Sequence, residues 1–519
     1  MFTITRMRTD HLTNPLGIDE AKPGFSWAIE SSQNDVRQLS YLIQVADDPG
    51  FATPHWDSGT VPSAESVQVL YAGPAFRPRT RYWWRVKLAT NRDGAGGWSP
   101  AAWFETGLLA AREWRGSFIS AEGLPGAAKS SVVTRLRKEF NAGAGIVSAR
   151  LYVTALGLYE ISLNGQRVGD WLFTPGWTSY GKRLLYQSYD VSNLVQSGAN
   201  AIGASLANGW FKGELAWKNQ RNFYGKQTAL VAQLHIRHAD GSEEVVATDT
   251  SWQGSDSPTV FAELYHGEIH DARREQAGWD MPGFAAAAGW RPVSPVTFPL
   301  DRLRAQDGVP VRRQEVLKPV AFMTTPKGER VLDFGQNLAG WVRFSVRGKA
   351  GDRVVLRHAE VLDAKGNFYT KNLRSARATL DYTLRGGETE HYEPRFTSMG
   401  FRYVQVAEWP GEIRPEAFEA VVIHSDMELT GDFECSNPLL NQLHHNILWG
   451  MKGNFLDLPT DCPQRDERLG WTGDAQVFAR TASFLMDTAP FFRKWLRDLS
   501  ADQLPDGGVP FVVPDVLAT

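Results

Sequence analysis

The sequence predicts a multidomain protein of the β plus α class, in which three β-sandwich or jelly-roll domains precede a helical segment. The chain has 519 residues, which is too long for a single hydrophobic core. Before Asp426 apolar residues mostly alternate with polar ones, which is the period of half-buried strands. After Asp426 apolar residues recur every three or four positions, which is the period of helices.

Residues 1–108 are predicted to form a small β-sandwich similar to a fibronectin type III module. In the run TRYWWRVKL, Tyr82, Trp84 and Leu88 fall on one face, and mostly charged residues take the other. This alternation is typical of a half-buried strand. The runs YLIQVADD before it and GGWSPAAWFETG after it predict neighbouring strands.

Residues 109–304 and 305–428 are predicted to form two further β-sandwiches. In LYEISLNGQRVGD, Asn164-Gly165 separates two alternating runs and indicates a tight hairpin turn. In the later block the runs ERVLDFGQNLAGWVRFSV, DRVVLRHAEVL and GFRYVQVAEW also alternate, and Gly, Asp or Pro bound each of them. The helical segment is assigned to residues 429–519.

Three helices are predicted in the helical segment. Ser436 or Asn437 is expected to cap the first helix, Gly473–Met486 to form the second, and Asp487 or Thr488 to cap the third. The apolar residues expected on the buried faces are Leu440, Leu443, Ile447, Met451 and Phe455 in the first helix, Val477, Phe478 and Phe484 in the second, and Phe491, Trp495 and Leu499 in the third.

Composition and charge exclude several classes of protein. The net charge of -3 gives no electrostatic reason to expect nucleic acid or an anionic membrane as a partner. The N-terminus has no apolar core of signal-peptide length, and no window approaches the ~20 apolar residues of a membrane span. We therefore expect a soluble, cytoplasmic protein, and the sequence leaves its oligomeric state undetermined.

The cysteines and tryptophans have ordinary structural explanations. Cys435 and Cys462 fit neither a disulfide framework nor a Cys-rich metal site, and Cys462 has no recognisable His partner that would make it a nucleophile. The 19 Trp residues could stack on sugars, but Trp-rich sandwich cores are the preferred explanation for any individual Trp.

The most informative stretch is DCPQRDERLGWTGD, which connects the first two predicted helices. Crowded acids raise one another's pKa, so such crowding destabilises the fold unless the acids are solvated, paired with cations or functional. The residues that make the stretch unusual are the acids Asp461, Asp466, Glu467 and Asp474, interleaved with Arg465, Arg468 and Trp471.

Hydrolysis of a glycosidic bond would use these residue types. One carboxylic acid protonates the leaving oxygen, and it stays protonated if it is buried near other carboxylates. Glu467 suits this role, because Asp466 and Asp474 are close in sequence and Trp471 can supply an apolar wall. The remaining Asp residues and Arg465 suit the binding of sugar hydroxyls. The competing explanation is a surface loop with Arg–Asp pairs.

No metal or other cofactor is expected. The spacing of the acids does not follow the calcium-binding loop pattern, and no HExxH or paired His set accompanies it. Gly-containing segments such as DFGQNLAG lack the phosphate-loop pattern, so nucleotide binding is unsupported as well.

The stretch DLPTDCPQRDERLGWTGDAQ resembles the signature of bacterial α-L-rhamnosidases of glycoside hydrolase family 78. LYVTALGLYEISLNGQRVGDWLFTPGWTSYGKRLLYQSYDV resembles the N-terminal β domain of that family, and VLDFGQNLAGWVRF and PRFTSMGFRYVQV resemble its concanavalin-like β domain. Residues 429–519 would then be the first part of an (α/α)6 catalytic barrel, preceded by the three β domains.

The resemblance implies an inverting glycosidase that removes terminal α-L-rhamnose from small molecules or oligosaccharides. By this match Glu467 is similar to the general acid of the family, and Trp471 is similar to an aromatic wall that the C6 methyl group of rhamnose would contact. The residues similar to those that hold the sugar are Asp461, Arg465 and Asp466, with Asp474 as a further acid beside it.

The chain is expected to lack part of that active site. Twelve barrel helices need several hundred residues, and only about 90 follow Asp426. The catalytic base of the family would lie beyond Thr519, so we expect the 519-residue chain alone to be inactive. We also expect no inserted calcium-dependent module, because REWRGSFISAEG and SARLYVTALG lie too close together to hold one. Incomplete packing is expected to leave Phe491, Trp495 and Leu499 partly exposed.

Two alternatives remain open from the sequence. The first is an (α/α)-barrel glycosidase for another sugar, because the acid–base logic is shared and only the shape of the pocket differs. The second is a non-catalytic, multi-domain carbohydrate-binding protein built from β-sandwiches, which the Trp content would also suit.

Overall fold

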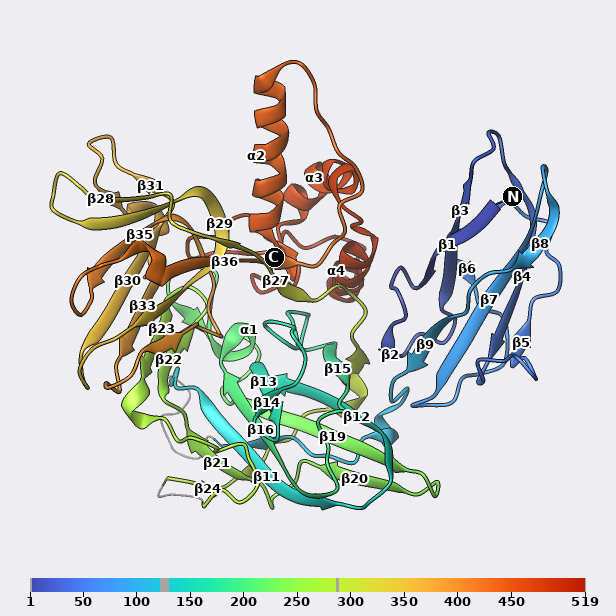
Figure 1. Cartoon of the computed structure of the whole chain (residues 1–519), viewed down its shortest axis with the longest axis horizontal. Coiled ribbons are helices and arrows are strands. Elements are labelled where there is room, and N and C mark those ends of the chain that lie inside the picture. The colour runs from blue at the N-terminus through green and yellow to red at the C-terminus, as the bar shows by residue number, and fades with distance from the viewer. Residues whose placement is uncertain (1, 122–129, 286–288, 519) are drawn as a thin grey trace. The chain divides into compact units, whose positions relative to one another are not determined.

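The structure is a computed structural model that describes residues 2–121, 130–285 and 289–518 (Figure 1). The chain forms two compact units. The first comprises Met1–Trp114, Gln187–Tyr189 and Leu303–Asp307, and the second comprises Arg115–Tyr186, Asp190–Arg302 and Gly308–Thr519. The described residues form several β sheets followed by three long helices, as the sequence predicts for a protein of the β plus α class.

Two sheets make up the first unit, and their inner faces share one core. Strand β7 (Arg81–Thr90) alternates strictly between buried and half-buried residues, which confirms the predicted strand. Phe25, Trp84 and Phe104 pack together in the core. The strands of one sheet are β1 (Phe2–Thr9), β3 (Gly24–Ser31) and β6 (Val69–Leu70). Those of the other are β2 (Leu16–Ile18), β9 (Ala102–Thr106), β7, β4 (Gln38–Ala46) and β5 (Trp56–Asp57), with β8 (Gly94–Trp98) beside β7.

The second unit begins with two large sheets. One has the order β25 (Ser294–Pro295), β10 (Ile119–Ser120), β19 (Ala229–His238), β12 (Ile146–Leu156) and β15 (Leu184–Asp190), with β20 (Glu243–Ala247) beside β19. The other has the order β14 (Gln166–Arg167), β13 (Leu158–Leu163), β16 (Gly198–Ala207), β11 (Thr134–Ala142), β21 (Gln253–Asp256) and β24 (Arg291–Pro292). The point where a calcium-dependent module would be inserted overlaps residues 122–129, which lie outside the described residues.

The predicted hairpin joins β13 to β14. Leu163 pairs with Gln166, so Asn164 and Gly165 are the two turn residues. Both have positive φ, 53° and 77°, which a two-residue turn of this kind requires and which Asn and Gly tolerate best. The turn prediction from sequence is confirmed.

A ten-stranded sheet follows, centred on the 17-residue strand β29 (Arg330–Val346). Its order is β22 (Thr259–Glu263), β23 (Gly267–Asp271), β33 (Thr379–Thr383), β30 (Arg353–Ala359), β35 (Met399–Glu408), β29, β36 (Phe418–Ser425) and β27 (Val311–Leu317). Strands β28 (Ala321–Thr324) and β34 (Glu390–Tyr392) also pair with β29. Since β22 and β23 precede residue 305, this sheet combines strands from two stretches that are well separated in sequence.

Three helices complete the second unit, close to the predicted positions. They are α2 (Pro438–Asn454), α3 (Thr472–Leu485) and α4 (Ala489–Asp502). The side chain of Asn437 accepts a hydrogen bond from the backbone N–H of Leu439, as expected for an N-cap. None of the helices in the described ranges has the length and hydrophobicity that crossing a bilayer needs.

The exposed apolar side chains are not the expected ones. Phe491 and Trp495 are only 1% and 5% exposed, so the expectation that they would be partly exposed is wrong, whereas Leu499 is half-buried as expected. Phe491 stacks on Phe455 at 4.7 Å between ring centroids, and the indole of Trp495 donates to the carbonyl of Val513. Conversely, the first turns of α2 are exposed at two positions expected to be buried, Leu440 and Leu443. In α3, Val477 and Phe484 are exposed as well.

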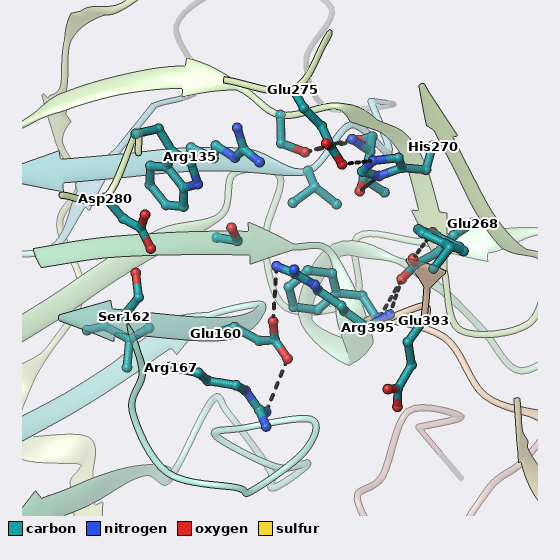
Figure 2. Close-up of a pocket in the computed structure, with 18 of the residues that line it drawn as sticks. Arg135, Glu160, Ser162, Arg167, Glu268, His270, Glu275, Asp280, Glu393 and Arg395 are labelled. Carbon is teal, nitrogen blue, oxygen red and sulfur yellow. Dashed lines mark hydrogen bonds and ion pairs between the residues drawn. The ribbon is translucent and has the colours of Figure 1, made fainter. Parts of the chain in front are cut away.

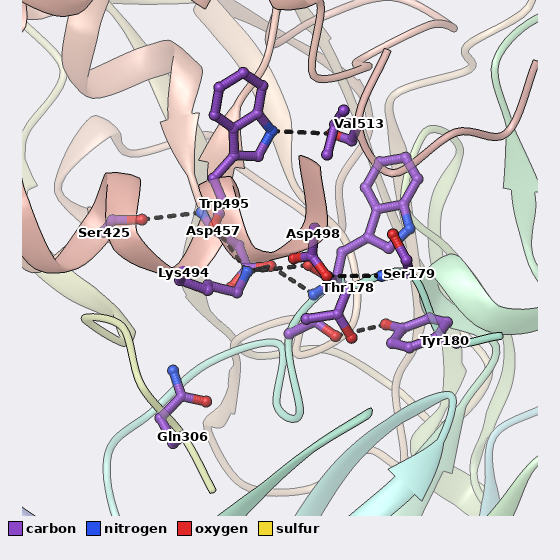
Figure 3. A network of polar contacts seen from close by, with 12 residues as sticks. Thr178, Ser179, Tyr180, Gln306, Ser425, Asp457, Lys494, Trp495, Asp498 and Val513 are labelled. Atoms are coloured by element: carbon purple, nitrogen blue, oxygen red, sulfur yellow. Dashed lines mark hydrogen bonds and ion pairs between the residues drawn. The ribbon is translucent and has the colours of Figure 1, made fainter. Parts of the chain in front are cut away.

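A buried ion pair fastens α4 to the β part of the same unit (Figure 3). The ammonium group of Lys494, whose side chain is 2% exposed, donates to Asp457 Oδ2 at 2.7 Å, to Asp457 O at 2.9 Å and to Trp177 O at 3.0 Å. The same carboxylate accepts from the backbone N–H of Trp177 at 2.5 Å. All three ammonium hydrogens therefore have an acceptor, which offsets the cost of burying the charge.

A second ion pair lies one turn further along α4. Asp498 Oδ1 accepts from the backbone N–H of Ser179 at 3.1 Å and lies 3.2 Å from the guanidinium of Arg183. The carboxylate of Asp502 accepts from the hydroxyl of Ser179 and pairs with Lys182 at 3.0 Å. One face of α4 therefore contacts residues 177–183 through ion pairs and hydrogen bonds of charged side chains, and not through apolar contacts alone.

We expect Lys494→Met to destabilise the attachment of α4 severely, because it leaves the buried carboxylate of Asp457 without a counter-ion. Breaking a buried pair in this way typically costs about 3–5 kcal/mol. Hydrogen exchange of the α4 amides, measured by mass spectrometry, should speed up accordingly. Arg480→Met, on the exposed face of α3, is the matched control and should leave exchange in α4 unchanged. Equal exchange in both variants would show that the ion pair does not hold the helix.

Candidate active site

The predicted acidic stretch connects α2 to α3 and is held in place by loops between β strands of the same unit. Ala216 forms a β-bridge with Glu467, and the hydroxyl of Tyr265 donates to the carbonyl of Glu467 at 2.7 Å. The buried guanidinium of Arg468 donates to the carbonyls of Leu264 at 3.2 Å and Ser398 at 2.7 Å. The position of the stretch is therefore set by residues some 70 to 250 positions earlier in the chain.

The backbone of the stretch is strained where it carries its central acid. Glu467 has φ 139° and Arg468 has φ 48°, both in regions that residues with a side chain rarely adopt. Such conformations typically cost about 1–3 kcal/mol each and persist only where the surroundings fix them. Here two hydrogen bonds fix these conformations. The hydroxyl of Tyr265 donates to the carbonyl of Glu467, and the guanidinium of Arg468 donates to the carbonyl of Ser398.

Arg465 links two of the predicted carboxylates. Its Nη2 lies 3.2 Å from Asp461 Oδ2, and its Nε donates to Glu467 Oε2 at 3.1 Å. Arg374, from the loop before β33, donates to the same Glu467 oxygen at 2.9 Å. Asp461 uses its other oxygen as well, because Oδ1 accepts from the backbone N–H of Leu469 at 3.0 Å.

Glu467 differs from Asp461 in keeping one oxygen available. Within the described ranges no group donates to Oε1, although Oε2 is held by two guanidinium groups. The side chain is 11% exposed. Glu467 therefore presents an anchored carboxyl group with one oxygen that a ligand can reach.

Asp466 points to a different partner. Its Oδ2 accepts from the hydroxyl of Ser375 at 2.7 Å. Its Oδ1 is buried and has no hydrogen bond, and the nearest cation, Arg374 Nη1, is 3.8 Å away. A buried acceptor without a donor is costly in the unliganded protein, so this atom is ready to accept a hydrogen bond from a ligand.

Burial changes the protonation of two neighbours. It raises the pKa of the Asp461 carboxyl; the Cys462 thiol acts in the opposite direction, and the negative charge of Glu467 adds to the rise. Burial beside Asp461 raises the pKa of the Cys462 thiol to about 12. A thiol that is protonated at neutral pH is a poor nucleophile, as the structural interpretation of Cys462 requires.

The same residues form the group best placed to hold a cation. Donor atoms of Asp461, Cys462 and Glu467 lie within 4.8 Å of one another. A metal ion would have to displace Arg465 from both carboxylates and deprotonate a thiol whose pKa is about 12. The arrangement thus favours the guanidinium over a metal ion at this position.

The structure does not bring every predicted residue into the cluster. Asp474 is exposed in the first turn of α3, and no described residue of the cluster bonds to it. Trp471 is the half-buried residue preceding α3, and its indole N–H is buried without an acceptor. The cluster contains Asp461, Arg465, Asp466 and Glu467, whereas Asp474 lies outside it.

Several participants were missed by sequence reasoning. Arg374, Ser375 and Tyr265 contact the cluster from loops that carry no recognisable motif. Glu360 was missed too: burial raises the pKa of its carboxyl, a hydrogen bond from Asn337 opposes the rise, and the charges of Arg465 and Arg468 oppose it further. Nothing in the local sequence around these residues could have indicated that they meet the acidic stretch.

Family comparisons match most of the chain, part by part. The matching descriptions are a Rha78A-like N-terminal immunoglobulin domain over residues 4–110 and an α-L-rhamnosidase N-terminal domain over residues 144–315. They continue with a bacterial α-L-rhamnosidase concanavalin-like domain over residues 323–424 and a bacterial α-L-rhamnosidase six-hairpin glycosidase domain over residues 428–519.

Individual relatives agree with these matches. An α-L-rhamnosidase of Streptomyces avermitilis is 36% identical over 99% of this chain and 66% of its own length, and one of Alteromonas sp. is 38% identical over 97% and 56%. The crystal structure of the Streptomyces avermitilis α-L-rhamnosidase complexed with L-rhamnose superposes with a TM-score of 0.95, at 34% identity, over 99% of this chain and 66% of that one. The α-L-rhamnosidase of Aspergillus terreus gives a TM-score of 0.94, at 40% identity, over 99% and 60%.

The fold is that of a multidomain protein in which β-sheet domains precede a helical segment, and the loop between its first two long helices carries the carboxylate–guanidinium cluster. The chain belongs to the bacterial α-L-rhamnosidase family, glycoside hydrolase family 78. It spans between 56% and 66% of the length of the curated relatives named above.

We expect only one of the two thiols to react in the native protein. Cys462 is buried and its thiol pKa is about 12, whereas Cys435 is half-buried near the start of α2. Titration with a disulfide reagent at pH 8 should modify about one thiol per chain, and both after denaturation. Cys435→Ser should abolish the native reaction. Rapid modification of both thiols would contradict the burial of Cys462.

Proposed function

We propose that the cluster is the acid side of the active site of an inverting glycosidase that releases terminal α-L-rhamnose. Glu467 protonates the leaving oxygen of the glycosidic bond. The observation that carries this proposal is the asymmetry of its carboxyl group, since Oε2 is anchored by Arg374 and Arg465 and Oε1 has no partner among the described residues. A general acid needs one carboxyl oxygen that holds it in position and a second oxygen that can reach the leaving oxygen of the substrate.

The remaining cluster residues bind the sugar in this proposal. Asp461, Arg465 and Asp466 hold the hydroxyl groups, and Trp471 forms an apolar wall against the C6 methyl group. Two buried polar atoms without partners support this assignment, Asp466 Oδ1 as an acceptor and the Trp471 indole N–H as a donor. Asp474, exposed on α3, would have to contact a more distant part of the ligand.

The named relatives support the choice of substrate. The Streptomyces avermitilis and Aspergillus terreus proteins are α-L-rhamnosidases, and the former was crystallised with L-rhamnose. For this chain we therefore propose rhamnosylated small molecules or oligosaccharides as substrates. The apolar wall would favour a 6-deoxy sugar over one with a hydroxymethyl group.

We further propose that the catalytic base is not among these 519 residues. Each of the last three acids has a structural role. Asp502 bonds to Ser179 and Lys182, Asp506 accepts from the backbone N–H of Gly508, and Asp515 accepts from the backbone N–H of Ala518. Asp502 is held through both carboxylate oxygens, and within the described residues none of the three forms an ion pair or a hydrogen bond with the acidic stretch.

Glu467→Gln should impair hydrolysis in a way that depends on the leaving group. In the protein extended to the length of its relatives, kcat/KM for methyl α-L-rhamnoside should fall about 10²- to 10⁴-fold, because an alkoxide needs protonation. For 2,4-dinitrophenyl α-L-rhamnoside the loss should be much smaller, since that phenolate leaves without an acid. Glu412→Gln, an exposed change, is the control. Equal losses on both substrates would mean that Glu467 only positions the sugar. Cleavage of other nitrophenyl glycosides at comparable rates would favour a glycosidase for another sugar.

The 519-residue chain itself should bind L-rhamnose without releasing it from glycosides. Calorimetric titration should give a measurable heat that Glu467→Ala weakens, because that carboxyl group lies in the binding site. If binding persists unchanged in the variant, the sugar is bound elsewhere and a lectin-like function of the β domains is favoured. Release of rhamnose at ordinary enzyme rates would show that a base is present after all.

A further inference from the structure

A second polar cavity lies away from the acidic stretch, among the β strands of the second unit (Figure 2). Its volume is about 440 Å³, within the range of pockets that hold small ligands. Its walls include residues of β11, β13, β23 and the segment 391–396. No lining residue comes from the acidic stretch, residues 461–474.

Most of the charged groups in this cavity are already neutralised. Glu160 pairs with Arg167 at 3.1 Å and with Arg395 at 3.4 Å. Glu393 pairs with Arg313 at 2.7 Å, and Glu275 pairs with Arg385 at 3.5 Å and lies 3.2 Å from His270. These groups shape the cavity but have little unmatched charge to offer a ligand.

The buried carboxyl of Glu268 is also satisfied. It accepts hydrogen bonds from the hydroxyl of Tyr392 at 2.8 Å and from the backbone N–H of Phe396 at 2.5 Å. Burial raises the pKa of Glu268, and these hydrogen bonds partly offset the rise. Its role is thus to hold the wall formed by residues 391–396.

Arg135 is the exception among the cations. The Nε and Nη1 atoms of its guanidinium are buried and have no hydrogen-bond partner, and the group lies over the ring of Trp279 at 4.6 Å. Burial lowers the pKa of Arg135 to about 10, so the group is charged at neutral pH. A buried guanidinium without an ion pair is costly unless a ligand supplies the missing acceptors.

Asp280 stands near Arg135 without pairing with it. Among the described residues no ion pair joins the two, although the negative charge of Asp280 acts on the guanidinium. The cavity therefore combines one unmatched cation, one unmatched carboxylate and an aromatic ring, with the hydroxyl of Ser162 nearby (Figure 2). Carboxylate acceptors, guanidinium donors and an aromatic surface are the groups that bind sugar rings.

We infer that this cavity is a second saccharide site, separate from the Glu467 cluster, for a sugar residue that carries a carboxylate. The carboxylate of the ligand pairs with Arg135, and its ring hydroxyls donate to Asp280. The site would let the protein hold an acidic saccharide, independently of any hydrolysis at Glu467.

Calorimetric titration of the 519-residue chain tests this inference. The probes are methyl β-D-glucuronide and methyl β-D-glucoside, which differ only at the carboxylate. We expect the glucuronide to bind about tenfold or more tightly than the glucoside, as one charge-assisted contact would give. Arg135→Gln should remove this preference. Arg414→Gln, at an exposed arginine outside the cavity, and Glu467→Gln should both leave it unchanged.

Several results would overturn the inference. They are no detectable binding of the glucuronide, equal binding of both probes, or an unchanged preference in Arg135→Gln. Acetate or phosphate binding as tightly as the glucuronide would mean a simple anion site. Loss of binding in Glu467→Gln would mean that the sugar occupies the acidic cluster. If circular dichroism shows that Arg135→Gln does not fold, the two probes are compared on the unaltered chain alone. Equal binding of the glucuronide and the glucoside would then still overturn the inference.

Discussion

The geometry of the candidate active site depends on the buried ion pair between Lys494 and Asp457. Asp457 lies just before the acidic stretch, and its carboxylate joins the backbone of Trp177 to the ammonium of Lys494. This contact fixes the beginning of the stretch and α4 to the same loop, which precedes β15. In the middle of the stretch, Arg468 is held by the backbone carbonyls of Leu264 and Ser398, which lie in loops next to β23 and β35. Because Asp457 and Arg468 are both fixed, Glu467 between them can be kept in a strained conformation.

The carboxylate cluster is stabilised mainly by guanidinium groups, which also prepare it for a ligand. Arg465 separates Asp461 from Glu467, so that two acids can lie close together without their full mutual repulsion. The buried polar atoms of the stretch that have no partner are Gln464 Oε1, Asp466 Oδ1 and the Trp471 indole N–H. A fold rarely tolerates such atoms for stability alone, because each costs free energy in the absence of a ligand. Their presence in the same short stretch as the accessible carboxyl oxygen of Glu467 is the physical argument for a sugar-binding site.

The two polar sites of the second unit illustrate opposite solutions to buried charge. In the acidic stretch, acids and guanidinium groups neutralise one another, and what remains available is a carboxyl oxygen. In the second cavity most of the acids are matched as well, and what remains available is the guanidinium of Arg135 together with the carboxylate of Asp280. A hydroxyl-rich neutral ligand suits the first site, and an acidic ligand suits the second. Both sites draw their walls from segments far apart in the chain, so neither could form before the β sheets are assembled.

The sequence by itself determined the local structure and the core of the cluster. Alternation predicted β7, Asn164-Gly165 predicted the hairpin between β13 and β14, and Asn437 predicted the start of α2, because each depends on residues within a few positions. Asp461, Arg465 and Glu467 could be grouped for the same reason. Only the tertiary structure decided that Arg374, Ser375 and Tyr265 meet them, that Asp474 does not, and that Leu440 is exposed while Phe491 is buried. Periodicity shows which face of an element is apolar, but what covers that face depends on contacts between distant segments.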